Sequence, residues 1–343
     1  MRLLLALIGS LLLAACARPV PDDVTVLTYA TPYPPSHPFS QADQRWIDFV
    51  EKESGGRISI RAVWSGALLS SDMSMEELRH GVADVGLVTP IYTRGGTHLT
   101  RIQTGFYSGA DSIESQLALY KCLTERIPQM REEMSGLEIL VVQGGLQPGI
   151  LTRTRPVRNL EDLRGLRIRA PTELLSVLSS LGADPVNMPM GEVYSALAKG
   201  VIDGVIAPPD TFRALHFTEV AKYYYEIRVP RGGYPSRAMS AKRWNSLEDW
   251  QRNLLERSKD VWESALAEEI RKSEAVGREA AEGLITYFPA DPADQKRFDE
   301  IYLRDSEINA SHLRKFGIDG PAAFRLARES IVARDQIKCG GVS

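Results

Sequence analysis

Histidines and acidic residues are the side chains of this 343-residue sequence that most readily support catalysis or metal binding. The five histidines are His37, His80, His98, His216 and His312. No two of them stand four residues apart or beside a cysteine, the spacings typical of metal ligands. Acidic pairs such as Glu76-Glu77 fall in helical stretches, where solvated faces commonly carry charge. Only His37 stands out, because it lies in a proline-rich loop after the first expected strand, where α/β sheets place ligand groups.

Signatures of enzymes are missing from the chain. It has no Gly-x-Ser-x-Gly nucleophile turn and no Gly-x-Gly-x-x-Gly or Walker-type phosphate loop. A net charge of −3 gives no basic surface for nucleic acid, and 43% hydrophobic residues describe an ordinary globular core. We therefore expect a monomeric binding protein with no catalytic residues, no metal and no cofactor, rather than an enzyme.

The N-terminus has the pattern of an export signal. Arg2 precedes an apolar run from Leu3 to Leu13 that is too short to span a bilayer, followed by small residues and Cys16. Leu-Ala-Ala-Cys resembles the lipobox of bacterial lipoproteins, which implies that residues 1–15 are a lipoprotein signal peptide and that Cys16 receives the lipid. A plain signal peptide with an incidental cysteine is the alternative.

Two features follow from export. Residues 16–24, which include two prolines and two aspartates, are expected to be a flexible tether. The remaining cysteines, Cys122 and Cys339, can form one bridge in an oxidising compartment, with two buried free thiols as the alternative. Any membrane attachment is expected to be through the lipid alone.

The mature chain alternates strand-like and helix-like segments. The first unit has strands expected at Val24–Ala30, Arg57–Val63 and Val82–Val88, with helices over Phe39–Val50 and Met73–His80 between them. A second unit has strands at Leu137–Val142, Leu151–Thr154, Leu166–Ala170 and Val201–Ala207, with helices at 159–163, Glu173–Leu181 and Glu192–Lys199. This alternation predicts an α/β fold with helices on both faces of a sheet.

A very long helix is expected from Ser246 to Tyr287. Its apolar stripe contains Trp250, Leu254, Val261, Ala265 and Val276 and lacks heptad regularity. A helix of this length is too long for one compact domain, so we expect it to brace two lobes.

Two motifs of the second unit resemble a known family. They are Leu-Glu-Asp-Leu-Arg-Gly-Leu-Arg-Ile-Arg-Ala-Pro at 160–171 and Leu-Gly-Ala-Asp-Pro-Val-Asn-Met-Pro-Met-Gly-Glu-Val-Tyr-Ser-Ala-Leu-Ala-Lys-Gly-Val-Ile-Asp-Gly at 181–204. Both are similar to the solute-binding proteins of tripartite ATP-independent periplasmic (TRAP) transporters, of the dicarboxylate-receptor (DctP) type. Segments 49–58, 66–69 and 77–86 follow the same template, so the resemblance covers residues 25 to about 325.

The resemblance implies a two-lobed, periplasmic-binding-protein-like α/β fold with a ligand cleft between the lobes. Residues 25–146 plus 233–272 would form lobe I, residues 147–232 plus 273–325 lobe II, and 326–343 a C-terminal segment. The implied function is a periplasmic, lipid-anchored receptor that binds a small organic acid and delivers it to a TRAP membrane permease.

In this family the arginine of the first motif pairs with the ligand carboxylate, which assigns that role to Arg169. A guanidinium suits it, because two parallel N–H donors match a carboxylate and the charge persists on desolvation. Strand alternation places Arg167 on the same face, so one of the two arginines can be only a rim charge.

Further ligand contacts are implied by position. They are His37 in the first loop, Thr89 and Tyr92 after the third strand, Met190 where members often place an aromatic residue beside the site, Ala207, and Tyr234. For Met190 and Tyr92, a packing role remains open.

The chain departs from the family pattern at Ala207, where members often carry a ligand-facing asparagine, and at Gly149, where some carry a second basic residue. Because a second buried carboxylate would then lack partners, these departures favour a monocarboxylate with an apolar or aromatic body. Arg94 or an unplaced residue can supply the missing charge. A dicarboxylate cargo, a ligand sensor and an exported hydrolase remain alternatives.

Overall fold

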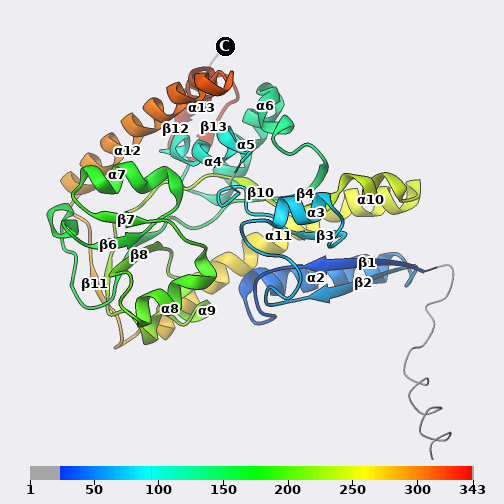
Figure 1. The fold of residues 1–343 in the computed structure, drawn as a ribbon, viewed down its shortest axis with the longest axis horizontal. Coiled ribbons are helices and arrows are strands. Elements are labelled where there is room, and N and C mark those ends of the chain that lie inside the picture. The colour runs from blue at the N-terminus through cyan, green and yellow to red at the C-terminus, as the bar shows by residue number, and fades with distance from the viewer. Residues whose placement is uncertain (1–23, 94, 342–343) are drawn as a thin grey trace, which may run out of the picture.

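The computed structural model describes residues 24–93 and 95–341. The signal peptide, Cys16, most of the tether and Arg94 lie outside the described residues. The described chain forms two α/β lobes side by side (Figure 1), so the expected fold class is confirmed.

Lobe I is built on a five-stranded sheet in the order β2-β1-β3-β10-β4. Its strands are β1 (Thr25–Ala30), β2 (Ile58–Val63), β3 (Val85–Leu87), β4 (Leu137–Gln143) and β10 (Tyr234–Ser240). The first three are parallel, and β10 is antiparallel to both β3 and β4. The sheet of lobe I therefore includes β10, which follows the strands β5 to β9 of lobe II in the chain.

Lobe II is built on a six-stranded sheet in the order β11-β9-β5-β8-β6-β7. Its strands are β5 (Gly149–Thr152), β6 (Arg167–Arg169), β7 (Asp184–Val186), β8 (Gly204–Ala207), β9 (Tyr223–Tyr225) and β11 (Thr286–Phe288). β6 is parallel to both neighbours, whereas β5 is antiparallel to β8 and β9. The chain therefore crosses between the lobes after β4, after β9 and along one long helix.

Helices cover both sheets. In lobe I they are α2 (Pro38–Glu53), α3 (Ser74–Arg79), α4 (His98–Ile102), α5 (Ile113–Arg126), α6 (Pro128–Glu132) and α10 (Ala241–Ser246). In lobe II they are α7 (Leu175–Ser180), α8 (Val193–Ala198) and α9 (Thr211–Ala214). After the long helix, α12 (Pro292–His312) contacts both α7 and α4, and α13 (Gly320–Ser330) contacts α5. Short 3-10 turns lie at Gln103–Tyr107, Leu160–Leu163, Thr172–Leu174, Met190–Glu192, Phe217–Glu219 and Leu313–Phe316.

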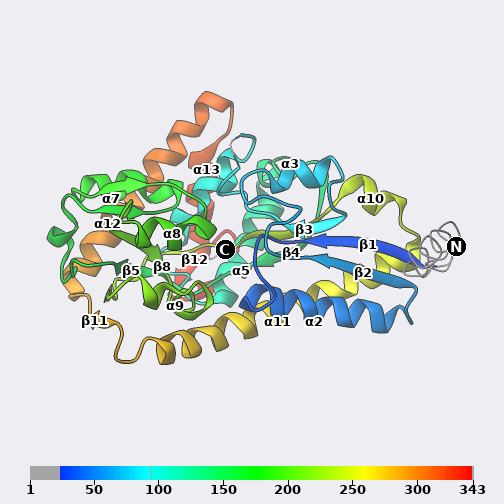
Figure 2. The same ribbon diagram turned by 60° about the horizontal axis from the view of Figure 1, so that its bottom comes forward.

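The long helix is α11 (Asp249–Ala280), and it begins at a capping box formed by Glu248 and Gln251. It packs on α2 and β4 in lobe I and on α9 in lobe II, so it braces both lobes as expected (Figure 2). The expected end at Tyr287 is wrong, because Tyr287 lies in β11, which pairs with β9. Gly283, at a φ of 69°, lies in the turn that separates the helix from this strand.

The expected apolar stripe of α11 is right in part. Leu254 and Ala265 are buried, but the residue that enters the core at the centre of the helix is Trp262 rather than its neighbour Val261. The Trp262 ring stacks on Trp46 of α2, with ring centroids 3.8 Å apart. At this turn of the helix the buried position is 262 rather than 261, and the Trp262 indole fills the space between α11 and α2.

The C-terminal helices pack beside α4 and α5. Side chains of α12 and α13 share a hydrophobic cluster with Leu99, Phe106 and Leu119. A disulfide joins Cys122 of α5 to Cys339, with Cα atoms 5.5 Å apart. The chain end after the hairpin of β12 (Ile331–Ala333) and β13 (Gln336–Ile337) is thereby covalently tied to α5.

Candidate functional site

A cavity of about 150 Å³ lies between the lobes. A cavity of this size holds a molecule as large as benzene. From lobe I and its crossing strand the lining includes Tyr33, His37, Phe39, Thr89, Ile91, Tyr92, Thr104, Gly232 and Tyr234. From lobe II and the crossing segments it includes Pro148, Arg169, Pro171, Glu173, Leu174, Met190, Ile206, Pro208, Asp210, Thr211, Leu215, Val229, Pro230 and Arg231. Most of this surface is apolar or aromatic, with a few polar groups set into it.

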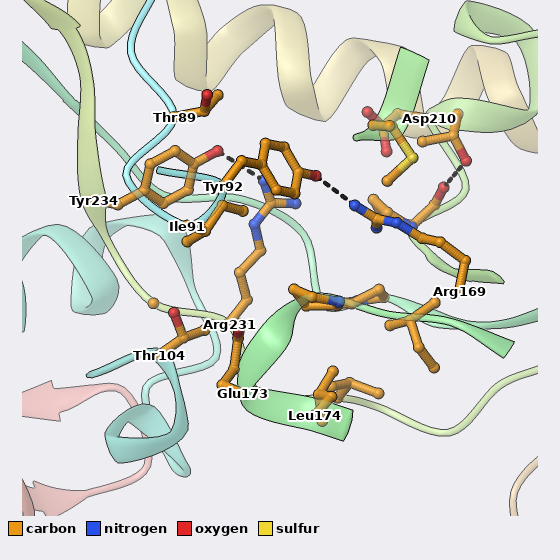
Figure 3. Close-up of a pocket in the computed structure, with 18 of the residues that line it drawn as sticks. Thr89, Ile91, Tyr92, Thr104, Arg169, Glu173, Leu174, Asp210, Arg231 and Tyr234 are labelled. Carbon is orange, nitrogen blue, oxygen red and sulfur yellow. Dashed lines mark hydrogen bonds between the residues drawn. The ribbon is translucent and has the colours of Figure 1, made fainter. Parts of the chain in front are cut away.

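Arg169 enters the cavity from β6 and is only 2% exposed. Its Nε donates to the Met188 carbonyl at 2.9 Å, and Nη2 donates to the Tyr92 hydroxyl. Tyr92 follows β3 in lobe I, so the second bond joins the lobes across the cavity (Figure 3). Among the described hydrogen bonds none uses Nη1, and this nitrogen remains for a ligand.

Arg167 has a different environment although it lies only two residues away. Its Nη2 pairs with Asp203 at 2.9 Å, and its side chain is 42% exposed. It does not line the cavity. Of the two arginines considered from the sequence, Arg169 faces the cavity and Arg167 does not.

A second arginine in the cavity was missed from the sequence. Arg231 lies in the segment that crosses back to lobe I, and its Nη2 donates to the Tyr234 hydroxyl at 3.2 Å. Its guanidinium packs so closely on Gly145 that a Cβ there would lie 2.4 Å from Cζ. The available signal was its place at the lobe crossing, directly before Gly232-Gly233-Tyr234.

Two carboxyl groups in the cavity were also missed. Glu173 is 5% exposed and Asp210 is 6% exposed, and one oxygen of each, Oε2 and Oδ1, is buried without a hydrogen-bond partner among the described residues. Burial raises the pKa of Glu173 to about 7, against the lowering effect of Arg169, Arg101 and Arg231. Burial likewise raises the pKa of Asp210 to about 6. Buried carboxyl oxygens without partners are costly, so they mark capacity that a ligand can fill.

His37 lines the cavity and also begins α2. Its Nδ1 accepts a hydrogen bond from the Phe39 backbone N–H at 3.2 Å, and its ring stacks on Tyr33 with centroids 4.0 Å apart. Burial and the charge of Arg237 lower the pKa of His37 to about 3. The imidazole is therefore neutral near pH 7 and acts as a helix cap and a wall of the cavity.

The other residues expected from the sequence divide between the cavity and the core. Thr89, Met190 and Tyr234 line the cavity together with Arg169, His37 and Tyr92. Ala207 does not: it is fully buried and packs in a hydrophobic cluster of lobe II, while its neighbours Ile206 and Pro208 reach the cavity. The alternation of β8 directs its side chain to the opposite face of the sheet.

Gly149 pairs with Ala207 between β5 and β8. A Cβ at this glycine would lie 2.7 Å from the Tyr224 hydroxyl and 2.6 Å from the Tyr225 carbonyl oxygen. The Tyr224 hydroxyl itself accepts from the Gly149 N–H at 2.8 Å and donates to the Ala207 carbonyl at 3.2 Å. A tyrosine therefore occupies the space that a side chain at 149 would need, and the second cation of the cavity comes from Arg231 instead.

These features define a class. Two α/β lobes are joined by crossing strands and a long helix, and the cavity between them combines cations and apolar walls, which is the arrangement of a two-lobed solute receptor. The chain belongs to the bacterial extracellular solute-binding protein family 7 (DctP), whose model matches residues 29–303. It is thereby a TRAP periplasmic solute-binding protein of the DctP family, as the resemblance implied.

Relatives and solved structures agree with this assignment. The C4-dicarboxylate-binding periplasmic protein DctP of Rhodobacter capsulatus is 25% identical over 268 residues, 75% of this chain and 78% of that protein. A TRAP solute-binding protein of Bordetella bronchiseptica with bound mandelate has a TM-score of 0.77 at 23% identity, covering 90% of this chain and 98% of that one. One of Rhodoferax ferrireducens with copurified benzoate has a TM-score of 0.79 at 24% identity, with the same coverage.

Two searches of the described residues bear on other kinds of site. Within residues 24–93 and 95–341 no group of three or more histidine, cysteine or acidic side chains is arranged to hold a metal ion. In the same ranges no helix combines the length and the hydropathy needed to cross a bilayer.

Proposed function

We propose that this protein is an extracytoplasmic receptor that binds a small organic acid between its lobes and delivers it to a TRAP membrane permease. The observation that carries the proposal is Arg169, an almost fully buried guanidinium at the wall of the cavity between the lobes with a nitrogen left for a ligand. A carboxylate is the group that a desolvated guanidinium recognises best. The solved relatives that hold mandelate and benzoate bind molecules of this kind.

The mechanism that we propose is closure of the lobes around the acid. Tyr92 and Tyr234 belong to lobe I and its crossing strand, whereas Arg169 belongs to lobe II, so a ligand on Arg169 meets groups from both lobes only when they are closed. Contacts made only in the closed state shift the population toward it. The closed form would then be the one that the permease binds.

The sequence argument for a monocarboxylate needs revision. It left open that an unplaced residue supplies a second charge, and Arg231 is such a residue, whereas Ala207 does not line the cavity. The cations of the lining therefore fit both a monocarboxylate and a dicarboxylate, and the distinction depends on Glu173 and Asp210.

We further propose that the protein is anchored to the membrane by a lipid on Cys16, which rests on the Leu-Ala-Ala-Cys sequence alone. Radiolabelled palmitate should enter the wild-type protein and not Cys16→Ser. Equal labelling of both would refute the anchor and leave the receptor function untouched.

The receptor function is tested by thermal-shift measurements of the purified protein against a panel of organic acids. A ligand that binds only the folded state stabilises it by RT ln(1 + [L]/Kd), which is about 2.7 kcal/mol at a hundredfold excess over Kd. We expect at least one carboxylate to raise the melting temperature without being consumed. If no acid shifts the melt the proposal fails, and turnover of an acid would instead support an enzyme.

A further inference from the structure

The acidic residues of the cavity have no role in binding a carboxylate. Glu173 and Asp210 line the same cavity as Arg169 and Arg231, and each is more than nine-tenths buried. Neither forms an ion pair within 4.0 Å among the described residues, and Glu173 Oε2 and Asp210 Oδ1 accept no hydrogen bond there. Each side chain therefore has one buried oxygen that can still form a hydrogen bond.

The nearby arginines form no described hydrogen bond with these two carboxyl groups. Arg231 lowers the pKa of Asp210 by its charge, yet its Nη2 donates to Tyr234 instead. Arg169 uses its Nε on the Met188 carbonyl and Nη2 on Tyr92. In Figure 3 these two guanidinium groups and the two carboxyl groups surround one space from different sides.

Three kinds of ligand group can be compared beside these two carboxyl groups. A second carboxylate brings no hydrogen-bond donor and adds charge beside Glu173 and Asp210, which is unfavourable in a buried site. An ammonium group brings donors, but it would face the guanidinium groups of Arg169 and Arg231. A hydroxyl brings no charge, and it can donate to a carboxyl group that is ionised or accept from one that is protonated, which suits side chains whose pKa is raised to about 7 and about 6.

We propose that the cargo is a hydroxylated monocarboxylate whose carboxylate binds Arg169 and whose hydroxyl binds one of the two cavity carboxyl groups, Asp210 or Glu173. This proposal rests on the receptor function above and specifies its ligand class. It also separates a hydroxy acid from the dicarboxylate that the second arginine would otherwise suggest.

The test compares acids that share one body. Dissociation constants are measured by calorimetry for benzoate, its ortho, meta and para hydroxy derivatives, isophthalate, terephthalate and the corresponding aminomethylbenzoates. We expect one hydroxybenzoate to bind at least tenfold more tightly than benzoate, and the dicarboxylates and aminomethylbenzoates to bind more weakly than that isomer. A hydroxyl that gives no advantage in any position, or a dicarboxylate that binds most tightly, overturns the proposal.

Variants show whether the advantage comes from these residues. Asp210→Asn and Glu173→Gln each keep the size of the side chain and remove its charge. The ratio of benzoate to hydroxybenzoate dissociation constants should fall at least fivefold in one of them, and this ratio cancels any general loss of folding or affinity. Asp203→Asn is the matched control, because Asp203 pairs with Arg167 and does not line the cavity, so its ratio should stay at the wild-type value.

The outcomes are distinguishable from failure of the receptor function. If another organic acid stabilises the protein but no member of the benzoate series binds, the receptor function stands and this ligand class is refuted for an aromatic body. An unchanged ratio in both acidic variants also refutes it, even when hydroxybenzoate binds tightly.

Discussion

Two sets of buried charges in this protein differ in whether their hydrogen bonds are complete. The first lies in lobe I, where Asp43 of α2 pairs with Arg237 of β10 and both side chains are fully buried. Asp43 Oδ1 accepts from Arg237 Nε at 2.9 Å and from Trp262 Nε1 at 2.8 Å, and Oδ2 accepts from Arg237 Nη2 at 3.2 Å and from the Tyr29 hydroxyl. Arg237 Nη1 donates to Gln143 Oε1 at 2.8 Å. Every nitrogen of this guanidinium and both oxygens of this carboxylate have partners.

The second set lines the cavity, only a short way from the first. The Arg237 guanidinium lies 5.5 Å from the centre of the Phe39 ring, and Phe39 is itself part of the cavity wall. In the cavity, Glu173 and Asp210 each keep a buried oxygen without a partner among the described residues. The complete set holds α2, β10 and α11 together, whereas the incomplete set keeps its capacity for a ligand. The same residue types thus serve stability in one place and recognition in the other.

Removing Asp43 should have the largest effect on stability. Asp43→Ala leaves the Arg237 guanidinium buried without its counter-charge, which typically costs about 3–5 kcal/mol of unfolding free energy. Urea denaturation of the ligand-free protein measures this loss. Asp48→Ala on the exposed face of the same helix is the control and should change stability by less than about 0.5 kcal/mol. A loss in Asp43→Ala no larger than in the control would show that the network does not hold the lobe together.

Removing Arg169 should mainly weaken ligand binding, whereas removing Asp43 should mainly lower stability. Arg169→Gln should weaken binding of an organic acid by about 2–4 kcal/mol, roughly 30- to 700-fold, because the ligand carboxylate would then be desolvated without a cation. Calorimetric titration with the best acid of the thermal-shift panel measures the loss. Arg167→Gln, two residues away on the same strand, should bind the acid like the wild type. Equal losses in both variants would place the carboxylate elsewhere.

The fold was predictable from the sequence where local patterns agree with packing. The strands and helices of the first unit, from β1 to β3, fall within a few residues of their expected positions, because alternating apolar residues and terminal glycines define them locally. The end of α11 was not predictable in this way. Thr286–Phe288 continues an apolar pattern that suits a helix, and it becomes a strand only because β9 offers an unpaired edge.

The site was predictable only in the part that local motifs carry. Arg169 and His37 follow from sequence motifs and line the cavity. Asp210 and Arg231 belong to no such motif, since they meet in the cavity only after the chain has crossed between the lobes. Ala207 shows the reverse error: its motif position suggested ligand contact, but one step along a strand exchanges the two faces of the sheet.

The smallest expected effect is a pH dependence of the unfolding free energy that arises from Glu173. It tests whether the cavity charges oppose folding while those of lobe I support it. Its folded-state pKa of about 7 lies above the ordinary value of 4.5, so folding favours the protonated form. The stability from this group is complete below about pH 4.5 and is lost as the pH rises through 7. The unfolding free energy of the wild type relative to Glu173→Gln should therefore fall by about 2–3 kcal/mol between pH 5 and pH 8.

The comparison with Glu173→Gln isolates this residue from the other groups that face it or titrate nearby. The arginines that face it are the same in both proteins, His37 stays neutral because its pKa is lowered to about 3, and Asp210 titrates in both proteins. Urea denaturation of the two ligand-free proteins at matched pH values gives the difference directly. A flat difference would mean that Glu173 is as well satisfied as Asp43, so that the contrast between the two sets of charges fails at this residue. A difference that falls with rising pH would show that Glu173 is kept in the cavity at a cost to folding, as expected of a group reserved for a ligand.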